Sequence, residues 1–262
     1  GEGGERHPLA QHGVGRAARG QGEVDDPRAG LVMAHPQSAV ALGVEGRCGA
    51  REGGVHHRPS RLDRSQGGEA AARQCDISDE AAVQAAVADC VAQFGGLHAL
   101  VNMAGILRFD DTGELALDKW QRVLDINLTG TMLLCRTALP HLVEGGGSIV
   151  NAASTAALSG LPCGVAYSAS KGGVLAMTRS IAVEYAKRGV RANCVCPGDI
   201  KTDMTRGIDF PETMDYSLMG RISSLTGPKD AEVVAGVIAM LISDDGAHIT
   251  GEDIRVDGGT LS

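Results

Sequence analysis

The 262-residue sequence lacks features that mark several other classes of protein. No apolar run approaches the roughly 20 residues that a membrane-spanning helix requires, and the N-terminus has no hydrophobic core of a signal peptide. Acidic residues outnumber basic ones by 32 to 24, so the net charge of −8 gives no reason to expect a nucleic-acid partner. We therefore expect a protein with neither a membrane nor a nucleic acid as its partner.

The seven cysteines are scattered along the chain without the paired spacing of a disulfide framework. This distribution is typical of a reduced protein, and we expect it in the cytoplasm. Cys194 and Cys196 share one face of an expected strand, but no cluster of histidines or cysteines completes a metal site around them. We expect both side chains to be buried and expect no bound metal.

Lysine and aromatic residues are absent from residues 1–65, which hold five of the eight histidines. The longest apolar stretches of this segment, Gly30–Ala34 and Ala39–Leu42, are short, and neither a strand nor a helix period persists. Such a segment forms a poor core, and we expect it to be close to disordered.

From about residue 69 the pattern alternates between helix and strand. Ser78 is a candidate N-cap for a first helix that ends at Gly95-Gly96. The later helices are expected at Leu117–Leu142, where Pro140 kinks or ends the helix, at Tyr167–Lys187 and near Asp230–Ile242. The strands are expected at Leu97–Val101, Gly147–Ala152, Arg191–Cys196 and Asp253–Val256. This alternation predicts a single α/β domain with a doubly wound parallel sheet.

The strongest local signal is Tyr167-Ser-Ala-Ser-Lys171 at the start of a predicted helix. A spacing of four residues places the phenol and the ammonium on the same helix face. A free phenol titrates near about pH 10, too high for a base at neutral pH, but a neighbouring ammonium favours phenolate. The pair is a candidate general acid/base, and an ordinary surface pair is the alternative.

Two further polar residues are placed where they could join this pair. Ser154 closes the strand before the helix, and ligands of parallel α/β sheets lie beyond the carboxyl ends of strands. Asn127 lies in the long preceding helix, where an amide is usually exposed or disturbs the helix locally. Pointed inward, it could hold a water that reaches Lys171.

Asn127, Ser154, Tyr167 and Lys171 resemble the catalytic tetrad of the short-chain dehydrogenase/reductase family in order and spacing. The resemblance covers about residues 65–262 and implies a Rossmann-like fold and an oxidoreductase acting on CH–OH groups. Met103 departs from the family pattern, which usually has a second asparagine there. The further matching motifs are Cys75-Asp-Ile-Ser78, Asn102-Met-Ala-Gly105, Asn193-Cys-Val-Cys-Pro-Gly198, Ile249-Thr-Gly251 and Val256-Asp-Gly-Gly259.

The resemblance implies a role for each residue of the tetrad. Tyr167 would exchange a proton with the substrate oxygen, and Ser154 would hydrogen-bond that same oxygen. Lys171 would bind the nicotinamide ribose and lower the pKa of Tyr167, while Asn127 would order a water between Lys171 and solvent. The hydride chemistry itself belongs to the cofactor.

The same resemblance implies contacts with a nicotinamide dinucleotide. Taken alone, each of these positions is equally a turn or core residue. The expected adenine contacts are Asp76 and Ile77. The expected contacts where the dinucleotide crosses the sheet are Asn102, Ala104 and Gly105. The expected contacts beside the nicotinamide are Pro197, Gly198, Ile200 and Thr202, together with Tyr167 and Lys171.

The glycine-rich phosphate loop that follows the first strand in this family is missing. The candidates Gly13-Val-Gly15 and Gly43-x-x-Gly46-x-x-Gly49 follow no convincing strand. Cys48–Arg58, back-translated and read one nucleotide later, permits Ala-Ala-Leu-Ala-Arg-Glu-Gly-Ser-Ile-Ile-Ala, a helix end followed by a strand. We therefore hypothesise that most of residues 1–61 derive from the wrong reading frame.

Cofactor preference depends on Asp63, which falls near the end of the second strand if the reading frame returns near Leu62. A carboxylate there accepts hydrogen bonds from the adenosine 2′-hydroxyl and repels a 2′-phosphate, which favours NAD over NADP. The flanking Arg61 and Arg64 weaken this preference, and an exposed loop aspartate is the alternative.

The leading expectation is an NAD(H)-dependent oxidoreductase acting on a secondary alcohol or its ketone. Residues Met204–Ser224 are expected to cover a hydrophobic or alicyclic substrate, and core packing is the alternative role of their apolar side chains. These side chains are Met204, Phe210, Met214, Tyr216, Leu218 and Met219. The alternatives are an NADPH-dependent carbonyl or 3-oxoacyl reductase and a non-catalytic oligomeric scaffold. The family usually forms tetramers, so we expect a homotetramer packed through helices 117–142 and 167–187, with Trp120, Leu133 and Leu134 as candidate interface residues.

Overall fold

The computed structural model describes residues 29–35, 38–44, 71–205 and 208–262. Three features of the sequence lie outside these residues: Asp63, the loop candidate Gly13–Gly15, and the stretch Cys48–Arg58 on which the reading-frame hypothesis rests.

A central sheet with strand order β2-β1-β3-β4-β5-β8 organises the domain. The strands β3, β4, β5 and β8 run parallel to one another, which confirms the predicted parallel sheet in this part. Two short strands, β6 and β7, form a separate parallel pair next to it. The strands are β1 Ala29–His35, β2 Ser38–Val44, β3 Ala99–Asn102, β4 Gly147–Ala152, β5 Val190–Pro197, β6 Ile200–Lys201, β7 Lys229–Asp230 and β8 Asp253–Val256.

The β2-β1 edge of the sheet differs from what the sequence pattern predicts. The short apolar stretches at 30–34 and 39–42 lie in an antiparallel pair of strands, with Ala29 opposite Val44. β1 is also antiparallel to β3, with Ala34 opposite Ala99. Antiparallel neighbours require only a short connection, whereas parallel neighbours require a long crossover, so two adjacent seven-residue strands can pair only in this way.

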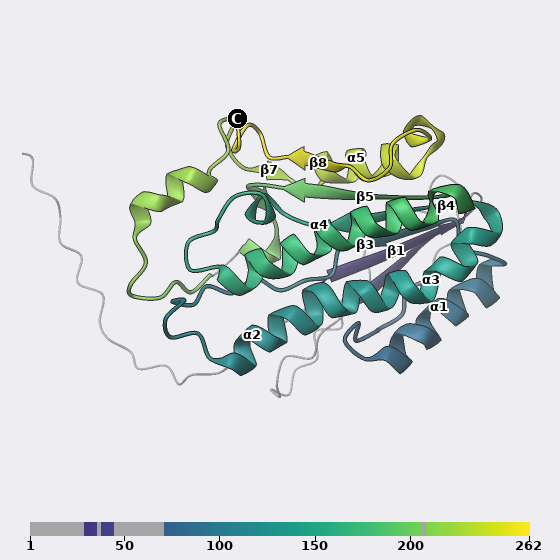
Figure 1. Ribbon diagram of the computed structural model, residues 1–262, viewed down its shortest axis with the longest axis horizontal. Coiled ribbons are helices and arrows are strands. Elements are labelled where there is room, and N and C mark those ends of the chain that lie inside the picture. Colours follow the sequence, from purple (N-terminus) through teal and green to yellow (C-terminus); the bar gives the residue numbers. More distant parts are fainter. Residues whose placement is uncertain (1–28, 36–37, 45–70, 206–207) are drawn as a thin grey trace, which may run out of the picture.

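Helices cover both faces of the parallel strands (Figure 1). One face, with Leu100 and Ile149, packs on α1, α3 and α4. The opposite face, with Val101, Val150 and Val195, packs on α5. Successive strand residues therefore face opposite layers, as a doubly wound sheet requires. The helices are α1 Glu80–Phe94, α2 Leu117–Leu124, α3 Thr131–Gly145, α4 Val165–Tyr185 and α5 Glu232–Ile242.

Two helix boundaries differ from the prediction. Asp79, rather than Ser78, caps α1, because its carboxylate accepts hydrogen bonds from the amides of Ala81 and Ala82 at 2.9 and 3.2 Å. The expected end at Pro140 is wrong, since α3 continues to Gly145 with the exposed proline inside it. A wide π-helical turn at Asp125–Gly130 joins α2 to α3.

A buried polar cluster interrupts the apolar core between the sheet and α4. The Asn102 amide on β3 donates to Asn151 Oδ1 on β4 at 2.8 Å. Asn151 in turn donates to Thr178 Oγ1 on α4 at 2.8 Å, and the Cys194 thiol on β5 donates to the same hydroxyl at 3.2 Å. These bonds satisfy most of the polar atoms of the cluster and so reduce the cost of burying them in the core; Asn102 Oδ1 is the exception among them.

Candidate active site

Three of the predicted site residues meet just beyond the carboxyl ends of the parallel strands. Ser154 follows β4 and caps a short 3₁₀ turn, where its hydroxyl accepts a hydrogen bond from the Ala156 amide at 3.1 Å. Tyr167 and Lys171 lie in the first turns of α4, which begins at Val165. Figure 1 shows that α4 starts at the same end of the sheet to which β5 and β8 point.

Tyr167 faces Ser154 rather than solvent. Only 8% of Tyr167 is exposed, and burial raises the pKa of its phenol because the phenolate loses its hydration. The Ser154 side chain forms a hydrogen bond with the phenol that acts in the opposite direction and lowers this pKa. The two hydroxyls therefore lie next to each other.

Lys171 brings a buried cation next to this phenol. Its Nζ donates to the Ala152 carbonyl oxygen at 2.8 Å and lies 5.8 Å from the centroid of the Tyr167 ring. Only 3% of the residue is exposed, and burial lowers the pKa of Lys171 to about 8. An ammonium at this position favours the phenolate form of Tyr167.

Asn127 points inward from the wide turn between α2 and α3. Its Oδ1 accepts from the Ile106 amide at 2.8 Å, and its Nδ2 donates to the Ile106 carbonyl at 2.9 Å. The same Nδ2 donates to Ser170 Oγ at 3.0 Å, next to Lys171 on α4. The side chain thus ties the segment after β3 to the catalytic helix, and both hydrogens of its Nδ2 are used in bonds to protein groups.

Gly105 separates Asn127 from Lys171. A Cβ atom at residue 105 would lie 3.1 Å from Asn127 Oδ1 and 3.3 Å from Lys171 Nζ. The absence of a side chain therefore keeps the space in front of the lysine free. Ala104, the preceding predicted contact, is buried.

The end of β3 carries an unsatisfied polar atom. Asn102 is 3% exposed, and within the described part of the chain its Oδ1 has no hydrogen-bond partner. A buried oxygen without a donor is costly unless a ligand or water supplies one. This atom and the open space at Gly105 fit a polar cofactor that crosses the sheet here, with hydroxyl groups to donate.

The predicted nicotinamide contacts lie at the carboxyl end of β5. Pro197 ends this strand, and the Gly198 amide donates to the Val256 carbonyl at 3.1 Å. A Cβ atom at residue 198 would come within 2.9 Å of Asp257 Cα, so only glycine allows this close approach. Ile200 begins β6, and Thr202 follows it.

The predicted adenine contacts are only partly available. The Asp76 carboxylate is exposed but accepts hydrogen bonds from the amide and the hydroxyl of Ser78 at 2.9 and 2.7 Å. The Ile77 side chain is buried in the core, where it packs against Gly130 of the wide helical turn. Ile77 therefore contributes to the hydrophobic core beneath the expected adenine position.

Sequence reasoning missed the segment after β3, which closes against the predicted substrate-covering residues. The Phe109 ring lies 4.6 Å from the Phe210 ring, centroid to centroid, and Thr213 Oγ1 donates to Asp111 Oδ2 at 2.8 Å. The Asp110 amide donates to the Cys163 carbonyl at 2.8 Å, which anchors this segment beside the start of α4. The sequence has only three phenylalanines, and this scarcity could have drawn attention to two of them.

Neither metal chemistry nor a membrane span has support in the described residues. They contain no group of three histidine, cysteine, aspartate or glutamate residues arranged to hold a metal ion. Cys194 and Cys196 are buried, as predicted. None of the described helices is long and apolar enough to cross a membrane.

Comparisons with known proteins agree with this geometry. A family described as enoyl-(acyl carrier protein) reductase matches residues 50–260. The chain is 40% identical to the 2-(R)-hydroxypropyl-CoM dehydrogenase of Xanthobacter autotrophicus, over 71% of this chain and 75% of that protein. It is 39% identical to the cyclohexanol dehydrogenase of an Acinetobacter species, over 75% of this chain and 76% of the relative.

A solved structure gives the same result at the level of the fold. The blue fluorescent protein from a metagenomic library, crystallised in complex with NADPH, superposes with a TM-score of 0.67 at 34% identity. The match covers 76% of this chain and 79% of the other. With the tyrosine, serine and lysine gathered at the carboxyl ends of the parallel strands, the chain belongs to the short-chain dehydrogenase/reductase family of oxidoreductases, which act on CH–OH groups.

Proposed function

We propose that the protein transfers a hydride between NAD(H) and a secondary alcohol or its ketone, with Tyr167 as the general acid/base. The observation that carries this proposal is the buried Tyr167 phenol, which is hydrogen-bonded to Ser154 and lies 5.8 Å from the Lys171 ammonium, measured to the ring centroid. A paired hydroxyl and a nearby cation are the groups that proton exchange with an alcohol oxygen requires.

In alcohol oxidation, the Tyr167 phenolate accepts the proton of the substrate hydroxyl, and the Ser154 hydroxyl donates a hydrogen bond to the same oxygen. In ketone reduction, the Tyr167 phenol returns this proton to the carbonyl oxygen. The nicotinamide, when bound, accepts or supplies the hydride at the substrate carbon. Lys171 stabilises the phenolate in both directions, because a positive charge close to a phenol lowers its pKa.

Asn127 acts in this mechanism by holding its neighbours in place. Its amide joins Ile106 to Ser170, and Ser170 precedes Lys171 on α4. A water ordered near Lys171, as the resemblance implies, could donate to Asn127 Oδ1, because this oxygen borders the space left open at Gly105 and accepts one bond, from the Ile106 amide. Its proposed role in proton exchange with solvent remains a prediction.

We propose NAD as the cofactor, with NADP as the alternative. Asn102, Gly105 and Lys171 would hold the ribose and phosphate side, and Pro197, Gly198, Ile200 and Thr202 would hold the nicotinamide. The proposed preference for NAD rests on Asp63, outside the described residues, whose carboxylate would repel a 2′-phosphate. Asp76 and Ala104 complete the proposed cofactor contacts, with Ile77 beneath them.

We propose a hydrophobic or alicyclic substrate. The Phe210 ring lies against the Phe109 ring, tilted by 56°, and is 5.9 Å from the Tyr216 ring, so three aromatic rings gather where the 204–224 segment meets the segment after β3. Met214, from the same segment, is buried. These side chains offer hydrophobic contact area next to the start of α4, which suits a hydrocarbon ring better than a charged chain.

The test is a panel of secondary alcohols measured with NAD and with NADP, using Tyr167→Phe as the blank. Cyclic and linear alcohols of matched carbon number separate the substrate classes, and 3-oxoacyl thioesters with NADPH represent the reductase alternative. We expect the highest kcat/KM for a cyclic alcohol with NAD. Absence of NAD(H) binding by the full-length protein would favour the non-catalytic scaffold instead.

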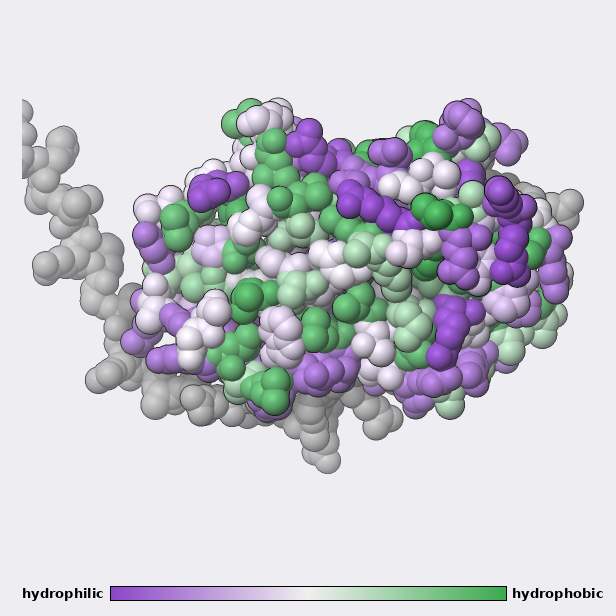
Figure 2. Space-filling model, in the orientation of Figure 1, coloured by the Kyte–Doolittle hydropathy of each residue, from purple (hydrophilic) through white to green (hydrophobic). Residues whose placement is uncertain are grey.

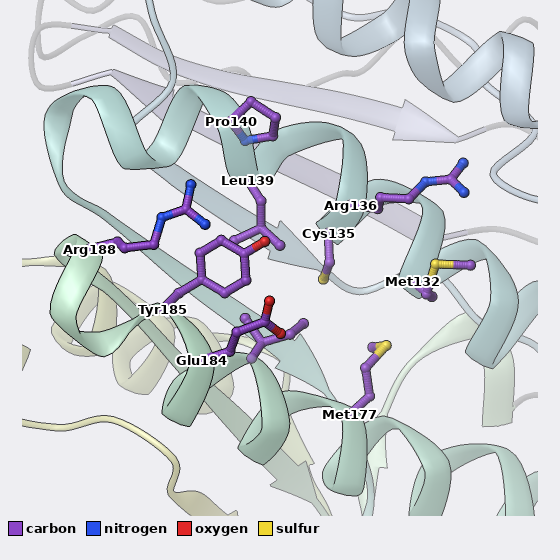
Figure 3. A pocket seen from close by; sticks show the side chains of 10 residues that line it. Met132, Cys135, Arg136, Leu139, Pro140, Met177, Glu184, Tyr185 and Arg188 are labelled. Carbon is purple, nitrogen blue, oxygen red and sulfur yellow. The ribbon is translucent and has the colours of Figure 1, made fainter.

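We also propose a homotetramer that packs through α3 and α4. A groove runs between these helices, lined by Met132 and Leu139 from α3 and by Met177, Ile181 and Tyr185 from α4 (Figure 3). Figure 2 shows hydrophobic residues reaching the surface on this side of the molecule. The candidates Leu133 and Leu134 are instead buried in the core.

Met177→Arg tests this interface, because it replaces an apolar side chain that lines the groove with a charged one. We expect light scattering to give the wild-type protein a mass four times the 27.0 kDa of the chain, and the variant a smaller one. Ala92→Arg on the exposed face of α1 is the control, since it adds the same charge elsewhere. An unchanged mass for Met177→Arg would contradict the proposed interface.

Finally, we propose that residues 1–262 form one cytoplasmic dehydrogenase domain and that most of residues 1–61 derive from a shifted reading frame. The compositional change near residue 65 supports the shift, and the six cysteines of the described residues, all free thiols, support a cytoplasmic location. Sequencing roughly the first 200 bases of the gene tests the shift, because a neighbouring frame should encode a glycine-rich loop between a strand and a helix. Its absence from all frames would contradict the proposal.

A further inference from the structure

A buried hydroxyl on α4 lies between two residues of the candidate active site. Ser170 directly precedes Lys171, and 0% of it is exposed. Its hydroxyl donates to the Tyr167 carbonyl oxygen at 2.7 Å and accepts a hydrogen bond from Asn127 Nδ2 at 3.0 Å. Because the side chain is inaccessible, Ser170 touches neither substrate nor cofactor, and any part in the reaction passes through these neighbours.

The hydrogen bonds of this hydroxyl determine which end of the Asn127 amide faces α4. A serine hydroxyl carries a single hydrogen, and in Ser170 the Tyr167 carbonyl oxygen accepts it. The hydroxyl oxygen is therefore an acceptor for Asn127, which requires the NH₂ end of the amide on this side. The bonds to Ile106 agree, since its amide donates to Asn127 Oδ1 and its carbonyl accepts from Nδ2.

Asn127 Oδ1 is thereby held in front of Lys171. A Cβ atom at Gly105 would lie 3.1 Å from Asn127 Oδ1 and 3.3 Å from Lys171 Nζ, so the oxygen and the ammonium border the same small space. The two bonds to Ile106 attach the Asn127 side chain to the segment after β3, whereas the bond to Ser170 attaches it to α4. Of these three bonds, the one to Ser170 fixes the oxygen relative to the lysine, because both partners of that bond adjoin the catalytic helix.

We infer that Ser170 is a positioning residue for the reaction: its hydroxyl holds the Asn127 side chain so that Oδ1 stays beside the Lys171 ammonium. This inference rests on the proposed function, because it assigns Ser170 a part in the proton exchange proposed there. Without the hydroxyl, one hydrogen of the Asn127 amide loses its acceptor, and the side chain loses its bond to α4. A displacement of about 1 Å in a positioned group can cost up to about a hundredfold in rate.

Ser148 provides a matched control for the removal of a buried serine hydroxyl. Only 1% of Ser148 is exposed, and its hydroxyl donates to the Leu241 carbonyl oxygen at 3.1 Å. It lies at the amino end of β4, whereas the candidate active site lies beyond the carboxyl end of this strand. The same substitution at both positions removes a buried hydroxyl, so a difference in turnover between the variants reports on the contacts of Ser170.

The first experiment compares Ser170→Ala with Ser148→Ala in the full-length protein. We expect Ser170→Ala to lower kcat about tenfold with an unchanged Kd for NADH, because the lost bond acts on the reacting groups. Ser148→Ala should retain the wild-type kcat, although the Tm of both variants should fall by about 2–4 °C. Normal turnover in Ser170→Ala, or an equal loss of kcat in both variants, would overturn the positioning role.

A double variant tests whether Ser170 acts through Asn127. In an Asn127→Ala background the Ser170 hydroxyl has no amide to hold, so adding Ser170→Ala should change kcat by less than about twofold. A further tenfold loss would mean that Ser170 acts by another route, such as its bond to the Tyr167 carbonyl oxygen, and would contradict the inference.

Hydrogen exchange at the Ile106 amide tests the same contact without requiring turnover. This amide donates to Asn127 Oδ1, so a less constrained Asn127 side chain protects it less. We expect it to exchange at least about tenfold faster in Ser170→Ala than in the wild-type protein or in Ser148→Ala, and equal rates would contradict the inference. An inactive wild-type protein would contradict the proposed function, whereas normal turnover in Ser170→Ala would contradict only this inference.

Discussion

Tyr167→Phe is expected to lower turnover by about 10²- to 10⁴-fold, the usual contribution of a positioned general acid/base. Phenylalanine keeps the ring and its packing but removes the hydroxyl that exchanges a proton with the substrate. Ser154 retains its hydrogen bond from the Ala156 amide, so its backbone position does not depend on the phenol. The first measurement is kcat with the best alcohol of the panel. The second is the Kd for NADH, and we expect this Kd to equal that of the wild-type protein.

Tyr185→Phe is the matched control for this result. Tyr185 ends α4, and its ring stacks under the Arg188 guanidinium at 4.6 Å, a contact that phenylalanine preserves. The control should retain wild-type turnover. If Tyr167→Phe also retains it, Tyr167 is not the acid/base and the proposed mechanism is wrong.

Lys171→Met is expected to abolish activity while making the folded protein more stable at pH 7. Burial lowers the pKa of Lys171 from 10.5 to about 8, so the ammonium is destabilised by about 3 kcal/mol relative to water. Losing its hydrogen bond to the Ala152 carbonyl costs about 1–2 kcal/mol. The free energy of unfolding should therefore rise by about 1–2 kcal/mol, while turnover falls at least about a hundredfold.

The stability gain should depend on pH in a defined direction. Below pH 8 the lysine is charged in both the folded and the unfolded chain. The folded protein then carries the full free-energy cost of burying the Lys171 ammonium. Between about pH 8 and 10.5 the unfolded chain binds more protons than the folded one, so the wild-type protein gains stability as pH rises. The methionine variant has no such group, and its advantage shrinks over this range.

Urea unfolding at pH 7 and at pH 9.5 measures this difference. Lys187→Met is the control, because Lys187 is exposed and its removal should leave the free energy of unfolding unchanged at both values. A Lys171→Met variant that is less stable than wild type at pH 7 would contradict a desolvation cost at this residue.

Local sequence patterns predicted much of the parallel part of the fold. The strands Gly147–Ala152 and Asp253–Val256 have the predicted bounds: the first is largely apolar, and the second alternates charged and apolar residues. The antiparallel pairing of β1 with β3 was not predicted, since it joins segments more than 60 residues apart. The wide turn at 125–130 was also missed, because no local residue type requires it.

In the candidate active site, too, some contacts could be predicted from the sequence and others could not. The meeting of Ser154 with Tyr167 and Lys171 could be predicted, because Tyr167 and Lys171 share a helix face and Ser154 directly follows a strand of the parallel sheet. The contact between Phe109 and Phe210 could not, since it depends on how two distant segments close on each other.

The polar cluster of Asn102, Asn151, Thr178 and Cys194 has a consequence for how uniquely the sheet assembles. The central strands are apolar on both faces, so hydrophobic burial alone hardly distinguishes one alignment of β3 and β4 from a slipped one. A slip of a single residue would separate Asn102 from Asn151 and break the 2.8 Å hydrogen bond between these two buried amides. The hydrogen bonds of the cluster thereby favour a single register of β3 and β4. Because the loops follow the strand ends, the same bonds favour a single arrangement of these loops.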